Sequence, residues 1–430
     1  MKVLLVQPYH PVNVKLFGKV YMSQLTLPMV AALTPTGVDI SIVDENVEPL
    51  NFEGDYDLVG ITALTPTATR AYEIADEFRS RGVRVVLGGV HPSLMVEEAL
   101  SHADSVVVGE AEETWPQLLA DASNGGLKRV YQGLARPSLE SLPHPRHDLT
   151  RRGAYNRIPK VETSRGCPLN CNFCSTTIIF GNRMRYRPVS DVVEEIKRLG
   201  ARFVFFTDNN IVGNIRYAKE LFRALIPLRV KWISQGSLNM ARDVELLALA
   251  AKSGCVGMLI GIESLVGEAI QAMGKRVNRV AEYARDIRRI HQHGIGIIGC
   301  FVFGFDQEDK TAFKRTVRFV RKLNIEVPQF TVLTPYPGTD LRREMENSGR
   351  ILHNEWHKYD VGHVVFRPEL MTADELLQGY RKACREVYSY GNITWRLLRS
   401  IPYLKSYYKV RVFLLVNLVY RKLFYASEEI

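Results

Sequence analysis

Three cysteines on one short loop are the residues of this chain best suited to chemistry. Cys167, Cys171 and Cys174 lie in the run SRGCPLNCNFC, with three residues and then two residues between them. Three thiolates can bind three irons of a 4Fe-4S cluster, whereas clusters with four cysteine ligands are closed and mostly transfer electrons. The spacing therefore predicts a cluster whose fourth iron is open to a substrate.

Two simpler interpretations of this loop are a zinc site and a set of buried structural thiols. Structural zinc usually has four ligands, often as two separate Cys-x-x-Cys pairs. This loop offers three, and Cys255, Cys300 and Cys384 are isolated in apolar stretches that are typical of core residues. The pattern favours the iron–sulfur cluster.

The cysteine loop resembles the signature of the radical S-adenosylmethionine (radical SAM) enzymes. The Arg-Gly pair before Cys167 and the aromatic Phe173 before Cys174 are part of that resemblance. It implies that S-adenosyl-L-methionine (SAM) binds at the open iron and that Phe173 packs on the adenine or on the cluster edge.

Composition limits the remaining possibilities. The chain has 430 residues, 46% of them hydrophobic and 24% charged, which suits two or three globular domains. Six cysteines do not make a disulfide framework, and no apolar run approaches the roughly 20 residues that span a bilayer. We therefore expect a cytoplasmic protein in a reducing compartment, with no nucleic-acid partner.

Residues 1–135 alternate short apolar strands with helices, and this alternation predicts a Rossmann-like (flavodoxin-like) α/β domain with a parallel sheet. Its strand ends resemble the cobalamin-binding domain, with Thr62 and Leu64 in YDLVGITALTP and Gly88 and Gly89 in VVLGGVHPS. The resemblance implies that Thr62 hydrogen-bonds a buried nucleotide tail and that the glycines let the corrin approach the backbone. In a generic flavodoxin-like domain, Gly88-Gly89 would only make a tight turn.

The first loop departs from the cobalamin pattern. Many such domains carry Asp-x-His-x-x-Gly here, and the histidine binds cobalt. This chain reads QPYHPVN, with no Asp two residues before His10 and no Gly three residues after it. We therefore expect cobalamin without a histidine ligand.

Residues 136–159 are rich in Pro, His and Arg and read as a linker. Residues 160–345 contain about six strand–helix units, too few for a closed eight-fold barrel. The resemblance implies an open (β/α)6 partial TIM barrel with the cluster at the carboxyl ends of its strands. We expect residues 346–430 to form a helical extension.

Polar residues follow two of the expected barrel strands. Asp208 and Asn209 come after one strand, and Glu263 and Ser264 after another. The resemblance implies that the first pair faces the amino group of SAM and that Glu263 accepts hydrogen bonds from its ribose. Alternatively, Asp208 and Glu263 cap helices.

Three arginines alternate in the run GNRMRYRP. In a strand, Arg183, Arg185 and Arg187 would share one face. That face could meet a carboxylate or a phosphate, or it could be a solvated basic edge.

The C-terminal segment is basic and aromatic. Residues 387–427 contain seven Lys or Arg and no acidic residue, interleaved with aromatic and aliphatic side chains. Such a segment is typical of peripheral contact with an anionic membrane. The alternatives are that it closes the open barrel or packs on a partner chain.

Together these patterns predict a cobalamin-dependent radical SAM enzyme that is a C-methyltransferase. The resemblance implies reductive cleavage of SAM to a 5′-deoxyadenosyl radical, hydrogen abstraction from an unactivated carbon and methyl transfer from methylcobalamin. The partners would be a one-electron reductant such as flavodoxin or ferredoxin and a small-molecule substrate, which would be apolar if the tail contacts lipid.

Three alternatives remain. The first is a radical SAM cyclase or oxidoreductase of the same architecture, acting on a tetrapyrrole or a lipid without methyl transfer. The second, a tRNA methylthiotransferase, is disfavoured because those enzymes carry further N-terminal cysteines and none precedes Cys167 here. The third, a cobalamin or SAM sensor, is disfavoured because a sensor needs no cluster with an open iron.

Overall fold

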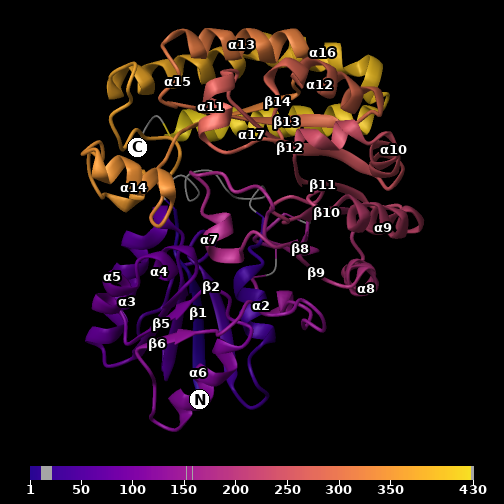
Figure 1. Ribbon diagram of the computed structural model, residues 1–430. Coiled ribbons are helices and arrows are strands. Elements are labelled where there is room, and N and C mark those ends of the chain that lie inside the picture. The colour runs from indigo at the N-terminus through magenta and orange to yellow at the C-terminus, as the bar shows by residue number, and fades with distance from the viewer. Residues whose placement is uncertain (11–21, 152, 157, 428–430) are drawn as a thin grey trace.

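The computed structural model describes residues 1–10, 22–151, 153–156 and 158–427. The chain forms two α/β domains with a helical C-terminal extension (Figure 1). In the figure the N-terminal domain lies below in indigo and purple, the second domain lies above, and the short helix α7 (Thr176–Phe180) lies between them.

The N-terminal domain is a parallel sheet of six strands in the order β2-β1-β3-β4-β5-β6. Its strands are buried apolar runs, as expected for a parallel sheet that is covered on both faces. The strands are β1 (Lys2–Gln7), β2 (Asp39–Asp44), β3 (Leu58–Thr62), β4 (Arg84–Gly88), β5 (Ser105–Val108) and β6 (Val130–Gln132), and the helices are α2 (Thr26–Ala32), α3 (Ala68–Ser80), α4 (Val90–Leu94), α5 (Val96–His102) and α6 (Thr114–Ser123).

This strand order is flavodoxin-like, as the sequence predicted. The strand order reverses between β1 and β3, which run parallel, and ligands in such sheets bind beyond the carboxyl ends of the strands near that point. Thr62 pairs with Gly88 at that edge of the sheet, so the two cobalamin-like motifs lie side by side.

The second domain is a parallel sheet whose six strands follow one another in chain order, which is the topology of an open six-unit barrel. A short antiparallel pair, β8 (Ser164–Arg165) and β9 (Arg185–Tyr186), flanks α7. The barrel strands are β7 (Lys160–Val161), β10 (Phe203–Phe206), β11 (Lys231–Gly236), β12 (Cys255–Glu263), β13 (Gly296–Phe303) and β14 (Val327–Val332), and the helices are α8 (Val189–Leu199), α9 (Ile215–Leu225), α10 (Val244–Lys252), α11 (Gly267–Ala272), α12 (Tyr283–Gln292), α13 (Thr311–Leu323) and α14 (Asp340–Asn347).

The linker at 136–159 forms no strand or α-helix in its described residues, only a single 3-10 turn at His147–Leu149. The two domains also meet through residues 351–366, which are irregular. Trp356, Tyr359 and Val365 of this segment belong to the hydrophobic core of the N-terminal domain. The Trp356 indole donates a 2.8 Å hydrogen bond to Glu98, so the C-terminal extension ties the barrel to the first domain.

Three helices, α15 (Ala373–Val387), α16 (Tyr390–Leu404) and α17 (Tyr407–Ser427), complete the chain. Phe413 of α17 is fully buried, and its ring occupies the space beside the backbone of Gly257 in β12 and Gly296 in β13. Phe301 of β13 packs on Phe319 of α13, so Gly296, five residues earlier in the strand, faces away from the covering helices. The tail therefore packs on the inner face of the barrel, which confirms the barrel-closing alternative for this segment.

We predict that Gly296→Ala destabilises the protein. A Cβ there would overlap the Phe413 ring, and overpacking of a core typically costs about 1–3 kcal/mol. The matched control is Gly391→Ala in α16, where nothing lies within 4 Å of an added Cβ and alanine should stabilise the helix by about 0.5–1 kcal/mol. Thermal unfolding midpoints should move in opposite directions, and equal midpoints would contradict the packing of α17 on this face.

A candidate cofactor site between the two domains

The cysteine loop lies between β8 and α7 and is held by backbone contacts. The Cys174 N–H donates to the carbonyl of Cys171 at 3.1 Å, and the Cys167 N–H donates to Gly181 at 3.3 Å. Gly166, at φ +94°, lies so close to Arg183 that an added Cβ would be 2.6 Å from its carbonyl oxygen. The loop before the first thiol therefore requires glycine.

Cys171 is buried, and Cys167 and Cys174 are partly exposed. Burial raises the pKa of Cys171 to about 12 and also raises the pKa of Cys167. Burial disfavours the thiolate form of these two cysteines, and a bound metal ion favours it. The nearby Phe173 packs edge-on against Phe305, with 6.1 Å between ring centroids.

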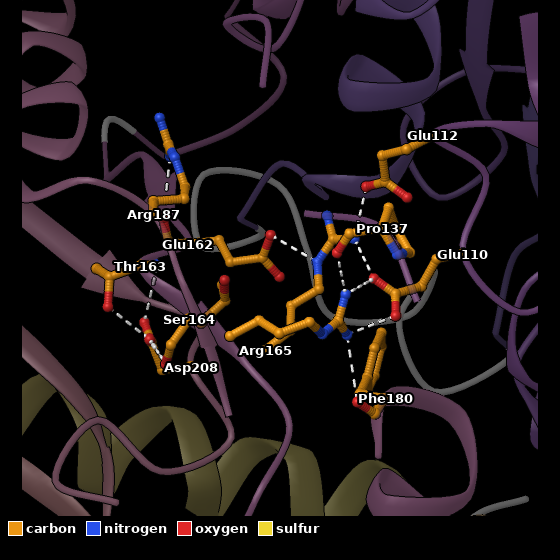
Figure 2. A network of polar contacts seen from close by, with 12 residues as sticks. Glu110, Glu112, Pro137, Glu162, Thr163, Ser164, Arg165, Phe180, Arg187 and Asp208 are labelled. Carbon is orange, nitrogen blue, oxygen red and sulfur yellow. Dashed lines mark hydrogen bonds and ion pairs between the residues drawn. The ribbon is translucent and has the colours of Figure 1, made fainter. Parts of the chain in front are cut away.

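Asp208 fixes the strand that enters the cysteine loop. Its fully buried carboxylate accepts hydrogen bonds from the Thr163 hydroxyl at 2.6 Å, the Thr163 N–H at 3.2 Å and the Ser164 hydroxyl at 2.5 Å (Figure 2). Burial raises the pKa of Asp208, and these donors oppose that rise. Asp208 therefore holds protein groups rather than capping a helix, and only its neighbour Asn209 lines a cavity.

Arg165 joins the two domains through buried ion pairs (Figure 2). Its guanidinium contacts Glu110 at 2.6 Å and Glu112 at 2.5 Å, both from the N-terminal domain, and Glu162 of the barrel at 2.9 Å. Arg185 adds a 2.6 Å pair to Glu110. Breaking a buried pair typically costs about 3–5 kcal/mol, so this network fixes the cysteine loop against the first domain.

The three alternating arginines do not act together. Arg187 is buried in a 2.5 Å pair with Glu195, Arg185 binds Glu110, and Arg183 is exposed. Strand β9 covers only two residues, so no common face forms. Carboxylates are the partners of Arg185 and Arg187.

A cavity of about 380 Å³ opens between the domains. All four residues of the cobalamin-like motifs, Thr62, Leu64, Gly88 and Gly89, line it. The barrel contributes Asn209, Glu162, Arg165 and, from α7, Ile179 and Phe180. The cavity therefore reaches from the carboxyl ends of the first sheet to the cysteine loop region.

At the carboxyl end of β12, Glu263 adopts φ +65°, where the register against β13 shifts. Such backbone costs about 1–3 kcal/mol in a residue other than glycine and often marks a functional position. The Glu263 carboxylate pairs with Lys275 at 2.5 Å. Ser264 donates to Glu308 at 2.6 Å and is buried, so the two predicted neighbours have different partners.

Sequence reasoning missed Glu110, Glu112 and Lys275. The two glutamates follow β5 at the carboxyl edge of the sheet, and that position is the signal that could have identified them. Lys275 lies in a turn after α11 and has no comparable signal in the sequence.

Comparison with known proteins assigns both domains. Residues 161–320 match the model of the radical SAM superfamily, and residues 19–119 match the B12 binding domain. The bacteriochlorophyllide d C-12(1)-methyltransferase of Chlorobaculum tepidum is 35% identical over 409 residues, covering 92% of this chain and 89% of that protein. This chain belongs to the cobalamin-dependent radical SAM enzymes.

Two further proteins are similar to this radical SAM enzyme. The bacteriochlorophyllide d C-8(2)-methyltransferase of the same organism is 34% identical, with 87% of each chain covered. The cobalamin-dependent SAM radical enzyme OxsB, solved with aqua-cobalamin and SAM, has the same fold, with a TM-score of 0.70, 15% identity and coverage of 96% of this chain and 72% of that one. The enzyme is of the methyltransferase class. Membership of this family also means that the cysteine loop binds an iron–sulfur cluster and is not a zinc site.

The cofactors of this enzyme are a 4Fe-4S cluster, SAM and cobalamin. When bound, the cluster supplies the electron that cleaves SAM, and cobalamin carries the methyl group. Cys167, Cys171 and Cys174 would hold the cluster, because three thiolates can bind three of its irons.

The lining of the interdomain cavity has features that suit cobalamin. Part of it is apolar, and at Gly89, with φ +92°, an added Cβ would lie 2.7 Å from the Thr62 hydroxyl. Glu112, which also lines the cavity, has a buried oxygen without a hydrogen-bond partner, a suitable acceptor for a corrin amide N–H. The apolar part of the lining includes Leu5, Gly60, Val86, Val107 and Trp115.

His10 is not among the cavity-lining residues, and no histidine lines the described part of the cavity. Most of the loop after His10 lies outside the described residues. That cobalamin binds without a histidine ligand stays a prediction.

We predict that Gly88→Ala weakens cobalamin binding at least tenfold, which corresponds to about 1.4 kcal/mol. An added Cβ would lie 3.7 Å from Val107, an ordinary contact distance, so the folded protein accommodates it. The substitution should therefore reduce the affinity for cobalamin without reducing the stability of the protein. The dissociation constant can be measured by absorbance titration with hydroxocobalamin. Gly126→Ala, remote from the cavity and with 3.9 Å to its nearest neighbour, is the control, and equal affinities would contradict a backbone approach at Gly88.

Proposed function

We propose that this enzyme methylates an unactivated carbon at the periphery of a cyclic tetrapyrrole of the bacteriochlorophyllide type. The observation that carries the proposal is the near full-length similarity to two methyltransferases named for different positions of the same pigment class. An aliphatic carbon has no acidic proton, so its methylation suits hydrogen-atom removal rather than a general base.

The arrangement of the site supports this chemistry. The cavity for cobalamin and the cysteine loop meet at the domain interface, so a substrate carbon between them can lie near both. The inner face of the barrel offers a largely apolar surface for a large substrate, because Leu259, Val302 and Thr331 on this face are only half-buried. On these grounds we assign SAM contacts to Asn209 and Glu263 and an adenine or cluster contact to Phe173.

Anaerobic turnover tests the proposal. With a bacteriochlorophyllide, SAM, cobalamin and a one-electron reductant such as flavodoxin or ferredoxin, we expect a product heavier by one CH2, together with 5′-deoxyadenosine and S-adenosylhomocysteine. The control is the Cys167→Ala, Cys171→Ala, Cys174→Ala triple variant, which should release no deoxyadenosine. Deoxyadenosine without S-adenosylhomocysteine would instead support the cyclase or oxidoreductase alternative.

We also propose that the outer face of α17 contacts an anionic membrane surface. Leu414, Leu415 and Leu418 are exposed there, and Arg411 and Lys422 flank them on the same face. Of the seven basic residues of the tail, Arg396 is instead fully buried and Lys409 binds the Gly294 carbonyl. No helix in the described part of the chain is long and apolar enough to cross a membrane.

Flotation with vesicles tests the membrane proposal. The enzyme should bind phosphatidylglycerol vesicles more than phosphatidylcholine vesicles and should detach as salt rises, because each basic residue contributes about 1 kcal/mol near such a surface. Leu414→Ser, Leu415→Ser, Leu418→Ser should abolish binding without removing the Phe413 anchor. A triple change at Leu134, Leu352 and Leu370, which are exposed elsewhere, is the control; an intact enzyme that ignores anionic vesicles would end the proposal.

A further inference from the structure

His91 lies next to the two loops that carry the cobalamin-like motifs. Its backbone N–H donates to the Ala63 carbonyl at 3.1 Å, and its ring nitrogen Nδ1 lies 3.3 Å from the Thr65 hydroxyl. Ala63 and Thr65 flank Leu64, and His91 itself follows Gly89 by two residues. Leu64 and Gly89 line the cavity, whereas His91 is fully buried and is not among the lining residues. One residue therefore joins the loop after β3 to the loop after β4.

The other nitrogen of the His91 ring is held by Glu98 of α5. Nε2 lies 3.3 Å from Oε1 of Glu98, and the same oxygen accepts the 2.8 Å hydrogen bond from the Trp356 indole. Burial by itself would raise the pKa of Glu98, but hydrogen bonds that include those from His91 and Trp356 outweigh burial and lower that pKa. Because an ionised carboxylate only accepts hydrogen bonds, Nε2 of His91 carries a proton and is the donor to Glu98.

Trp356 belongs to the C-terminal extension and packs edge-on against His91, with 4.9 Å between the ring centroids. Helix α14 holds the indole in this position, because the buried Arg342 guanidinium lies 5.7 Å from the centroid of the Trp356 ring. At the start of the same helix, the Leu341 N–H donates to the Asn172 carbonyl of the cysteine loop at 3.1 Å. A continuous line of contacts therefore runs from the cysteine loop through α14 and Trp356 to the two motif loops.

Loops that bind a ligand must be held in the arrangement that binds it. Loops are the more mobile parts of a domain, and the apparent affinity of a site falls with the fraction of time that it spends in other arrangements. The loop after β4 begins at Gly89, with φ +92°, and glycine restricts the backbone least of all residues. A buried histidine bonded to both motif loops reduces that freedom, so it should raise the affinity for cobalamin without contacting it.

We propose that His91 is a positioning residue for cobalamin binding and that Trp356 braces it through Glu98. His91 holds the two motif loops in the arrangement that binds the cofactor, and the C-terminal extension supports that arrangement from outside the N-terminal domain. The cobalamin site is therefore completed by a segment from the other end of the chain. The proposal concerns the cofactor and does not depend on which substrate the enzyme methylates.

The test is the dissociation constant of hydroxocobalamin, measured by absorbance titration of the full chain with its cluster reconstituted and without SAM. His91→Leu removes both hydrogen bonds of the ring and should weaken binding about tenfold. His91→Gln keeps an amide N–H for Glu98 and should restore most of the affinity. Trp356→Phe keeps an aromatic ring but removes the donor to Glu98, and it should weaken binding about threefold.

The matched control is Trp232→Phe in the barrel. Trp232 is also buried, and its indole donates to the Ser253 hydroxyl at 3.2 Å, so the same substitution removes the same kind of hydrogen bond. Trp232→Phe should lower the thermal unfolding midpoint as Trp356→Phe does, but it should leave the dissociation constant unchanged. The comparison separates support of the cobalamin site from a general loss of stability.

A double-mutant cycle tests whether Trp356 acts through His91. If it does, the double variant His91→Leu, Trp356→Phe should bind cobalamin no more weakly than His91→Leu alone. Fold-changes that multiply in the double variant would overturn the brace, and wild-type affinity in His91→Leu would overturn the role of His91. Should His91→Leu fail to fold, Trp356→Phe decides the matter, because wild-type affinity in that milder variant would also overturn the proposal.

Discussion

The burial of Arg165 among three carboxylates is the interaction on which the rest of the site depends. A guanidinium two residues before the first cysteine is removed from water, and this is tolerable only while Glu110 and Glu112 of the other domain remain against it. These ion pairs fix the two domains at the cavity between them, and the packing of Trp356, Tyr359 and Val365 in the core of the first domain holds the domains together at a second place. The same side chains form the wall of the cavity, so the groups that bind the domains together also shape the space for cobalamin.

The barrel is open because it lacks two strand–helix units, and the chain closes it with its own tail. The Phe413 ring fits on the sheet because positions 257 and 296 are glycine and carry no side chain. Asn417 of the same helix donates to the Glu326 carbonyl at 3.0 Å. Tyr420 reaches Gln329 at 3.1 Å on the next strand. The helix thus occupies the inner face near the amino ends of β12 and β13, while the reactive groups stand at the carboxyl ends. One face of α17 is therefore buried in the core of the barrel domain, and its opposite face is exposed to solvent.

The sequence predicted what depends on local spacing or on strand ends. The cysteine loop, the flavodoxin-like order of the first sheet and the six units of the barrel follow from short-range patterns, and Thr62 and Gly88 meet because parallel strands end at one edge. Partners remote in sequence could not be predicted. Glu110 meets Arg165 only after two domains dock, and Asp208 could be placed at a strand end but not assigned to Thr163 and Ser164. For the tail, the sequence left barrel packing and membrane contact as alternatives, because a helix with apolar residues on two faces is compatible with both.

Charge also explains why strained backbone persists at Glu263. The side chain stands at a register shift with φ +65°, and the two preceding carbonyls are bound by Lys275 and Asn278. Without those donors the strand end would have unsatisfied buried carbonyls in addition to its strain. The Lys275–Glu263 pair therefore keeps a carboxylate at the carboxyl end of β12, while Lys275 and Asn278 satisfy the backbone that precedes it.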